Sequence, residues 1–366
     1  EHCSADSLSD FAEALFKQWR QEGCPPSDIW VLSAVGRFGS ADAHLRLARF
    51  LPYQPMKSQW PHQRACAGVR ALAAAGTPVA FNQIYRLANA TYESMQRTEA
   101  LQSLGKLVAE QQAGVEELAD RWVPDIGFDL AGRLFFRAGE CSVEARLDEH
   151  LTLHFIWPNG ALSRRLPPAV QQLPRADYQR LCLDTRRVKR LLRDTVDLQI
   201  TRLRQSIALD YTRPVKIFIS QVLSHPILLR IARQMVWSCA SASGESFVFR
   251  PAEDGTIVDA QGNSVALPED GIVRLASEAV MSASETAAWL EHLADHEIIQ
   301  PINQFSGQAC LPIADELDAL RVNRFGQSPT TVGNLKRTFA SENWSHDKPQ
   351  EDGGYTRHFR AYPAAG

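Results

Sequence analysis

Apolar residues recur at helical spacing over the first 120 residues and are interrupted by glycine and proline. The run from Leu8 to Trp19 forms one apolar helical face and stops at Gly23 and Pro25. Five further runs predict helices over residues 29–35, 43–51, 62–75, 78–90 and 98–112. We expect the first of these five to end at Gly36 and Gly39. Helix pairs with a period near forty residues indicate HEAT-like repeats, with an irregular helical bundle as the alternative.

The pattern changes to short apolar runs after residue 120. Strands are predicted at residues 134–136, 143–147 and 151–157, followed by a turn at residues 158–160. Further on, a long helical face from Val188 to Ile207 precedes strands at residues 247–250 and 272–275 and a helix at residues 285–296. The fold class is therefore mixed α and β, with N-terminal HEAT-like helical repeats followed by an α+β C-terminal module. The expected boundaries are 1–120 for the repeats, 121–168 for a small antiparallel β segment, and 169–366 for the module.

Three blocks of sequence resemble one family: residues 117–128 (ELADRWVPDIGF), 224–237 (SHPILLRIARQMVW) and 289–301 (WLEHLADHEIIQP). This is a large bacterial family with a domain of unknown function, and it includes molybdate metabolism regulator (MolR)-like, WGR-associated proteins. The chain departs from the family at residues 275–278 (LASE), where a second His-Pro is frequent, and at His296, where Tyr is frequent. The resemblance implies a protein partner, such as a MoxR-type AAA ATPase or a von Willebrand A protein, and supplies no catalytic residue set.

Composition places the chain among ordinary globular proteins. It has 45% hydrophobic and 22% charged residues, and its net charge of −3 provides no overall positive field for nucleic acid or anionic lipid. The seven cysteines are scattered and form no C-x-x-C pair, which is typical of free thiols in a reducing cytosol, so we expect a cytoplasmic protein. No run of 18 apolar residues predicts a membrane span. The sequence at both ends suggests a fragment of a larger protein, with a C-terminally incomplete module.

His292, Asp295 and His296 are the candidate metal and catalytic residues. Two histidines four apart on a helix project from one face and could share a zinc ion. Asp295 occupies the position of the glutamate in the inverted zinc-protease motif, although its side chain is one methylene shorter. The alternative is an ordinary helix end, where histidine is favoured by the helix dipole.

His225 is a second candidate catalytic residue, as an acid, base or ligand at a helix start. Its neighbour Pro226 suits the first position of a helix, so a structural role at this helix start is the alternative.

A basic cluster consists of Arg186, Arg187, Lys189, Arg190 and Arg193. Residues 175–204 carry nine Lys or Arg against four Asp, a net charge of +5. Such a helix could contact nucleic-acid phosphates, and the alternative is a solvated face with acidic partners. No aromatic residue interleaves with these bases, so stacking on single strands is not indicated by the sequence.

Nucleotide-binding and nucleophile motifs are absent from the sequence. It contains no Walker loop, no G-x-G-x-x-G after a strand and no G-x-S-x-G elbow. We therefore expect a non-catalytic scaffold or regulatory protein-binding fragment without a cofactor. The alternatives are a metal-dependent enzyme that uses His292, Asp295 and His296, and a nucleic-acid contact through the Arg186–Arg204 helix.

Overall fold

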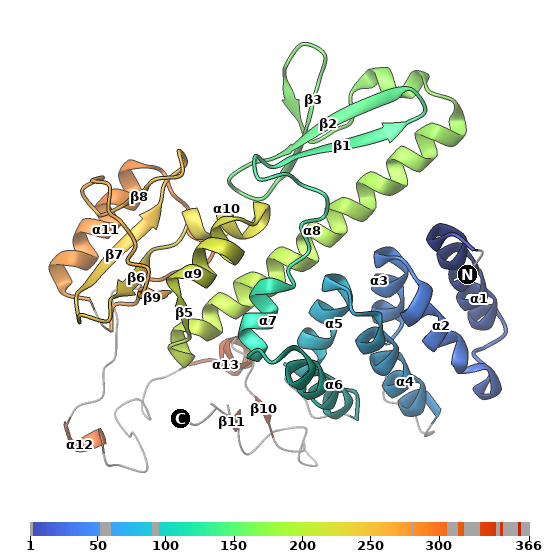
Figure 1. Ribbon diagram of the computed structural model, residues 1–366, viewed down its shortest axis with the longest axis horizontal. Coiled ribbons are helices and arrows are strands. Elements are labelled where there is room, and N and C mark those ends of the chain that lie inside the picture. The colour runs from blue at the N-terminus through green and yellow to red at the C-terminus, as the bar shows by residue number, and fades with distance from the viewer. Residues whose placement is uncertain are drawn as a thin grey trace. The chain divides into compact units, whose positions relative to one another are not determined.

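The computed structural model describes residues 3–51, 60–89, 95–279, 281–305, 314–317, 330–341, 345–346 and 358–359. These residues form two compact units: the first comprises the described residues up to Pro124 and from Thr331 to Phe359, and the second comprises those from Asp125 to Thr330. The first unit is helical up to Pro124, and the second, from Asp125, combines helices with antiparallel sheets (Figure 1). The chain is therefore mixed α and β. Most of the predicted module beyond residue 305 lies outside the described residues.

Up to Pro124, the described residues of the first unit form the six predicted helices and one further α-helix. Their bounds are α1 Ala5–Gln21, α2 Trp30–Phe38, α3 Ala41–Phe50, α4 Trp60–Ala75, α5 Pro78–Ala88, α6 Met95–Gln111 and α7 Val115–Arg121. Ser4, Ser40 and Thr77 cap three of them through a side-chain oxygen that accepts from a backbone N–H in the first turn. We did not predict α7, because seven residues are too few for a clear helical period.

The helices of this unit pack in two rows. One row runs α2, α4, α6 and the other runs α3, α5, α7, with each helix contacting the next (Figure 1). Helices α1 and α3 meet through side chains: Ser40 donates to Glu13 across 3.0 Å, and the Phe16 and Phe50 rings lie 5.5 Å apart. Since Glu13 precedes Phe16 just as Ser40 precedes Phe50, these two helices run in the same direction.

Helix α2 ends at Phe38 with Gly39 as its C-terminal cap residue, so the expected end at Gly39 is confirmed. Gly36 lies inside α2, and the expected end at Gly36 is wrong. A Cβ atom built on Gly36 would come within 2.1 Å of the Ala71 carbonyl oxygen in α4. The glycine therefore permits close approach of two helices, a role that its local sequence does not distinguish from a helix stop.

The second unit begins with the predicted small antiparallel sheet. Its strands are β1 Arg133–Ala138, β2 Cys141–Leu147, β3 Leu153–Ile156 and β4 Leu162–Ser163, paired in chain order. Gly160 occupies the predicted turn with φ of 81°. One face of the sheet is buried, with Phe136 and Phe155 at a ring separation of 5.9 Å. The long helix α8, Arg175–Leu209, packs against β1.

A second antiparallel sheet follows α8. Its strand order is β5-β9-β6-β7-β8, with bounds β5 Thr212–Pro214, β6 Trp237–Ala240, β7 Ser246–Pro251, β8 Ile257–Val258 and β9 Ile272–Leu275. The helices between and after these strands are α9 Val215–Ile217, a π-helical turn Phe218–Leu223, α10 Pro226–Arg233 and α11 Ala283–Asp295. Ser282 and Glu285 form a capping box at the start of α11.

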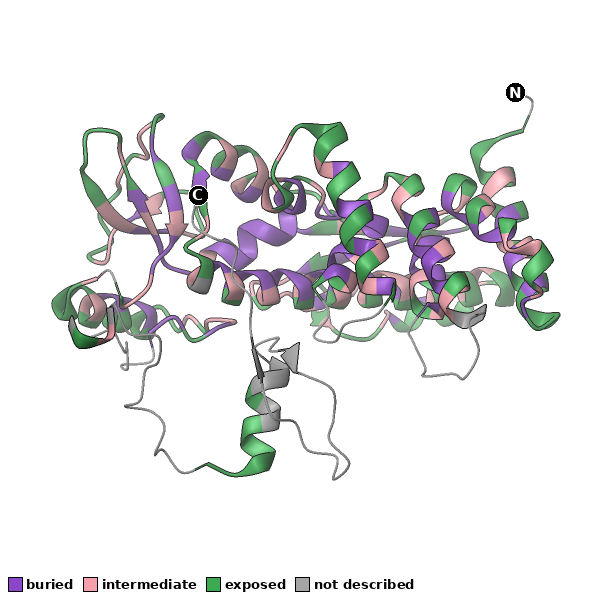
Figure 2. Ribbon diagram, turned by 90° about the horizontal axis from the view of Figure 1, so that it is seen from below, coloured by how far each residue is buried: buried purple, intermediate pink, exposed green. Residues whose placement is uncertain are grey.

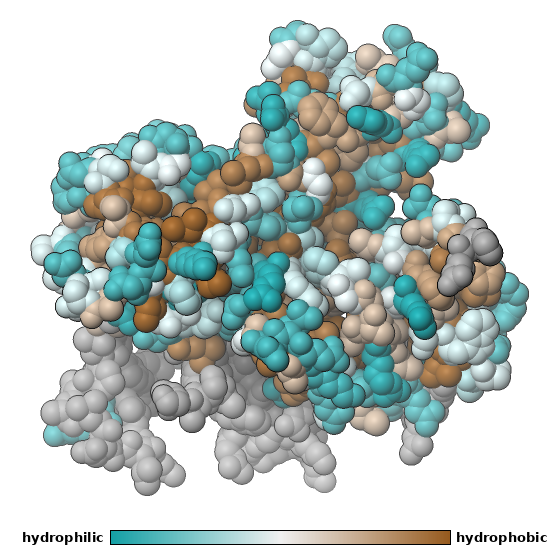
Figure 3. Space-filling model, viewed as in Figure 1, coloured by the Kyte–Doolittle hydropathy of each residue, from teal (hydrophilic) through white to brown (hydrophobic). Residues whose placement is uncertain are grey.

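The core of this second sheet region is aromatic. The Phe218 ring contacts those of Trp237 and Phe249, with ring separations of 4.9 and 5.9 Å. Helix α10 is almost wholly buried (Figure 2). Some apolar side chains stay at the surface around α9, α10 and β7 (Figure 3), among them Ile219, which is 45% exposed.

No single helix among the described residues combines the length and apolar character needed to cross a bilayer. Val215–Leu223 and Pro226–Arg233 together have that length and apolar composition, but the two segments are bent by 112° relative to each other.

Short elements near the C-terminal end are α12 Ala314–Leu317, α13 Val332–Ser341 and the antiparallel pair β10 Ser345–His346 and β11 His358–Phe359.

Candidate functional site

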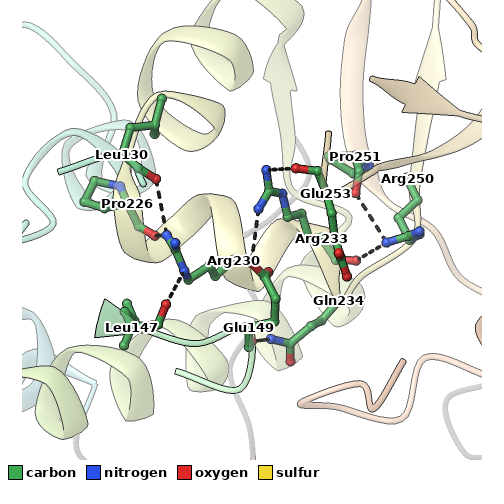
Figure 4. Close-up of polar contacts among 10 residues, drawn as sticks. All are labelled: Leu130, Leu147, Glu149, Pro226, Arg230, Arg233, Gln234, Arg250, Pro251 and Glu253. Atoms are coloured by element: carbon green, nitrogen blue, oxygen red, sulfur yellow. Dashed lines mark hydrogen bonds and ion pairs between the residues drawn. The ribbon is translucent and has the colours of Figure 1, made fainter. Parts of the chain in front are cut away.

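Arg230 joins helix α10 to the first sheet of the second unit (Figure 4). Its guanidinium donates to the carbonyl oxygens of Leu147 at 3.2 Å, Leu130 at 3.4 Å and Pro226 at 2.8 Å. Gly132 leaves the space for this side chain, because a Cβ there would lie 2.4 Å from an Arg230 terminal nitrogen. Arg230 is 4% exposed, and burial lowers the pKa of its guanidinium. The three carbonyls thus solvate a buried cation.

Arg233 and Gln234 extend this junction at the end of α10 (Figure 4). Arg233 pairs with Glu149 at 3.2 Å and donates to the Glu253 carbonyl at 2.7 Å, while the Gln234 amide donates to the Glu149 carbonyl. Glu149 lies in the loop between β2 and β3, so these contacts hold that loop of the first sheet against α10.

Arg250, on β7, is the third arginine of the junction. It donates to the Arg233 carbonyl at 2.9 Å and to the Pro251 carbonyl at 3.4 Å (Figure 4). Burial also lowers the pKa of Arg250. The guanidinium groups of Arg230, Arg233 and Arg250 already donate hydrogen bonds to backbone carbonyl oxygens. The junction that they form is therefore suited to holding the two sheets of the unit together. Sequence reasoning missed it, although an arginine inside the apolar run of residues 227–232 was an available signal.

His292 is buried and uses both ring nitrogens within the protein. Its Nε2 accepts from the Arg250 Nε at 3.4 Å, and its Nδ1 lies 3.1 Å from the Ala260 carbonyl oxygen, which fixes the proton on Nδ1. The His296 ring centroid lies 4.5 Å from that of His292, so the helix does bring the two rings together. Burial is the largest cause that holds the pKa of His292 below its usual value, followed by the charges of Arg250 and His296.

Asp295 and His296 lie at the exposed end of α11, and His296 is its C-terminal cap residue. Among the described residues, no group of three or more His, Cys, Asp or Glu side chains is placed to hold a metal ion. To bind zinc, His292 would have to give up its contact with Arg250 or with Ala260. The zinc hypothesis therefore stays a prediction that this geometry does not strengthen.

His225 caps the start of α10. Its Nδ1 accepts from the backbone N–H groups of Ile227 and Leu228, both at 3.2 Å, and Pro226 takes the first helical position. These contacts correspond to the structural alternative for His225. An acid–base role for His225 stays untested.

The basic cluster of α8 divides between two sides of the helix. Arg186, Lys189 and Arg193 line hollows between α8 and the first sheet, whereas Arg187 and Arg190 line neither hollow. The segment after β4 adds Arg164 and Arg165 to the same side. Aromatic residues, which do not interleave with the bases in sequence, also reach this side: Trp157 from the segment after β3 and Tyr178 from the first turn of α8.

Comparison with known proteins gives three findings. A family model described as a domain of unknown function, DUF4132, matches residues 160–344, just over half of the chain. The uncharacterized protein YehI of Escherichia coli is 28% identical over an alignment of 345 residues, and the match covers 91% of this chain. The chain spans 28% of the length of that relative. No solved structure matches. On the family match, the chain belongs to the DUF4132 family.

Proposed function

We propose that this chain is a non-catalytic, protein-binding part of a longer scaffold or regulatory protein, related to the MolR-like, WGR-associated proteins of bacteria. The two rows of helices in the first unit support HEAT-like repeats, since same-direction contacts between α1 and α3 are those expected of successive repeats. Stacked repeats offer an extended surface for a protein partner. An AAA ATPase or a von Willebrand A protein is the partner type that we propose.

The observation that carries this proposal is a groove between α1 and α3. It has a volume of about 520 Å³, with Phe16, Val35 and Ala43 among its apolar lining and Lys17 and Arg20 on its rim. Arg20 also lies over the Phe50 ring at 5.1 Å. A groove with an apolar floor accepts the apolar face of an amphipathic helix.

The rim charges indicate which helix would fit. Arg46 is paired with Glu13 at 3.2 Å and with Asp42, so its charge is compensated. Lys17 and Arg20 have no carboxylate partner among the described residues. The groove therefore favours a partner helix with acidic residues beside its apolar face.

Site-specific photo-crosslinking in cells tests the proposal. A photoreactive residue is placed at Lys17, on the rim, in the whole protein, and the control carries it at Gln18, which is exposed and does not line the groove. We expect one defined protein to crosslink from position 17 and not from position 18. No crosslink from position 17, or the same products from both positions, would contradict the proposal.

A further inference from the structure

A groove runs along α8 on the side that faces the first sheet of the second unit. It consists of two adjoining hollows of about 490 and 360 Å³, which share Arg164 and Lys189 in their walls. One wall is α8 from Tyr178 to Asp197, about 28 Å of helix at 1.5 Å per residue. The other wall comes from β3 and the segments beside it, close to where α8 packs on the sheet (Figure 1).

The groove is strongly cationic. Four side chains of the larger hollow are basic, namely Arg164, Arg165, Arg186 and Lys189, and none of its lining residues is acidic. The smaller hollow adds Arg193 and has Asp197 as its one acidic lining residue. No ion pair between described residues involves Arg164, Arg186 or Arg193. Cations that face one hollow without carboxylates produce a local positive potential despite the net charge of −3.

Lys189 is held at the centre of this groove. Its ammonium donates to the Arg164 carbonyl at 3.0 Å and lies 5.2 Å from the centroid of the buried Phe155 ring. Two N–H groups of the ammonium remain for a ligand. Burial lowers the pKa of Lys189, which an anion beside it would raise again.

Aromatic and polar groups flank the cations in the larger hollow. Trp157 is fixed by its indole N–H, which donates to the Arg165 carbonyl at 3.2 Å, and Tyr178 lies two helical turns before Arg186 on α8. Thr185, also in the lining, is 6% exposed, and its hydroxyl has no hydrogen-bond partner among the described residues. Rings beside a cationic track are the combination that binds nucleic-acid bases and phosphates.

We infer that this groove binds a single-stranded nucleic acid. Its phosphates would lie along Arg186, Lys189 and Arg193, which span about 10 Å of α8, with Arg164 opposite them. A base would stack at Tyr178 or Trp157. The hollows lie between a helix and a sheet, which suits a single strand whose bases can turn inward. An acidic peptide would use the cations but not the rings.

Fluorescence anisotropy with a labelled oligonucleotide of roughly 12 nucleotides tests the inference on the full chain. Binding should weaken as salt rises, with a log–log slope of about −0.7 for each phosphate contacted. In the Arg186→Gln/Lys189→Gln variant the slope should become shallower by about 1.4 and the affinity should fall at least about tenfold. The control, Arg180→Gln/Arg190→Gln, removes the same charge from exposed positions of α8 that line neither hollow.

Ring variants and competitors distinguish the ligand class. Tyr178→Leu should weaken binding at least about fivefold and Tyr178→Phe should restore it, if a base stacks on the ring. An absence of saturable binding, or an equal loss in the groove variant and the control, would overturn the inference. Equal competition by duplex DNA or by a glutamate decapeptide would also overturn it. The crosslinking at Lys17 concerns the first unit, so the two proposals fail independently.

Discussion

Arg250 on strand β7 donates its Nε–H to the Nε2 atom of His292 on helix α11, across 3.4 Å. The contact joins residues 42 positions apart and requires an unprotonated Nε2. It therefore couples the protonation of one buried histidine to the packing of α11 on the second sheet. His292 is thus tied to a neighbouring cation, which opposes a positive charge on its own ring.

Stability of the α11 region should fall in mild acid because of His292. The pKa of His292 lies below its usual 6.5 in the folded protein, so the unfolded state binds the proton first as pH falls. The stabilising contribution is full above pH 6.5 and is lost as pH falls from 6.5 through the folded pKa. Hydrogen exchange of α11 at neutral and mildly acidic pH checks this. The His292→Gln variant should show a smaller change of α11 exchange with pH. An unchanged pH dependence in this variant would contradict the assignment of the effect to His292.

Zinc should not accompany the purified chain in stoichiometric amount. Both ring nitrogens of His292 are engaged, so a metal would have to displace Arg250 or Ala260. Elemental analysis of the untagged protein measures this directly. One zinc per chain that disappears in the His296→Gln variant would contradict this expectation and support the metal-enzyme hypothesis.

Replacement of Gly36 by alanine should destabilise the first unit. The added Cβ would come within 2.1 Å of the Ala71 carbonyl oxygen, so α2 and α4 would have to move apart. We expect this shift to lower the free energy of unfolding by about 1–3 kcal/mol. Gly105→Ala in α6 is the matched control, because nothing lies within 4 Å of its Cβ. There alanine should stabilise the helix by about 0.5–1 kcal/mol. Denaturant unfolding followed by hydrogen exchange compares the two, and equal effects would refute the close approach.

Arg230→Met should destabilise the second unit by about 2–4 kcal/mol, since three carbonyls, two of them in buried contacts, lose a charged donor. Arg230→Lys should rescue little, because an ammonium cannot reproduce the guanidinium fork. Arg180→Met, at an exposed position, should stay within about 0.5 kcal/mol of the original protein. Urea unfolding midpoints of the three variants decide the matter, and full rescue by lysine would argue against the fork geometry.

Loss of the His225 cap should cost about 1 kcal/mol in the His225→Ala variant, and His225→Asn should recover most of it, as asparagine also accepts from the first helical turn. Thermal unfolding of both variants measures the difference. A fully stable His225→Ala variant would contradict the capping role of His225 and favour its acid–base alternative.

Local sequence patterns predicted most elements of this protein. Apolar spacing located α1 to α6 and α8, and alternation with turn residues located the first sheet, because these signals depend on neighbours within a few residues. The same signals failed for α7, which is short. They also failed for Gly36, because a glycine is needed there to let the backbone of Ala71 in another helix come close.

The sequence by itself determined the helical and strand periods, the charge excess on α8 and the pairing of His292 with His296 on one helical face. Only the tertiary structure decided that Arg164 and Trp157 join Lys189 in one groove, and that Arg230 and Arg250 are buried against carbonyl groups. The physical reason is separation along the chain. Such contacts join residues up to 100 positions apart. A pattern of neighbouring residues does not predict which distant carbonyl group or ring a side chain will contact.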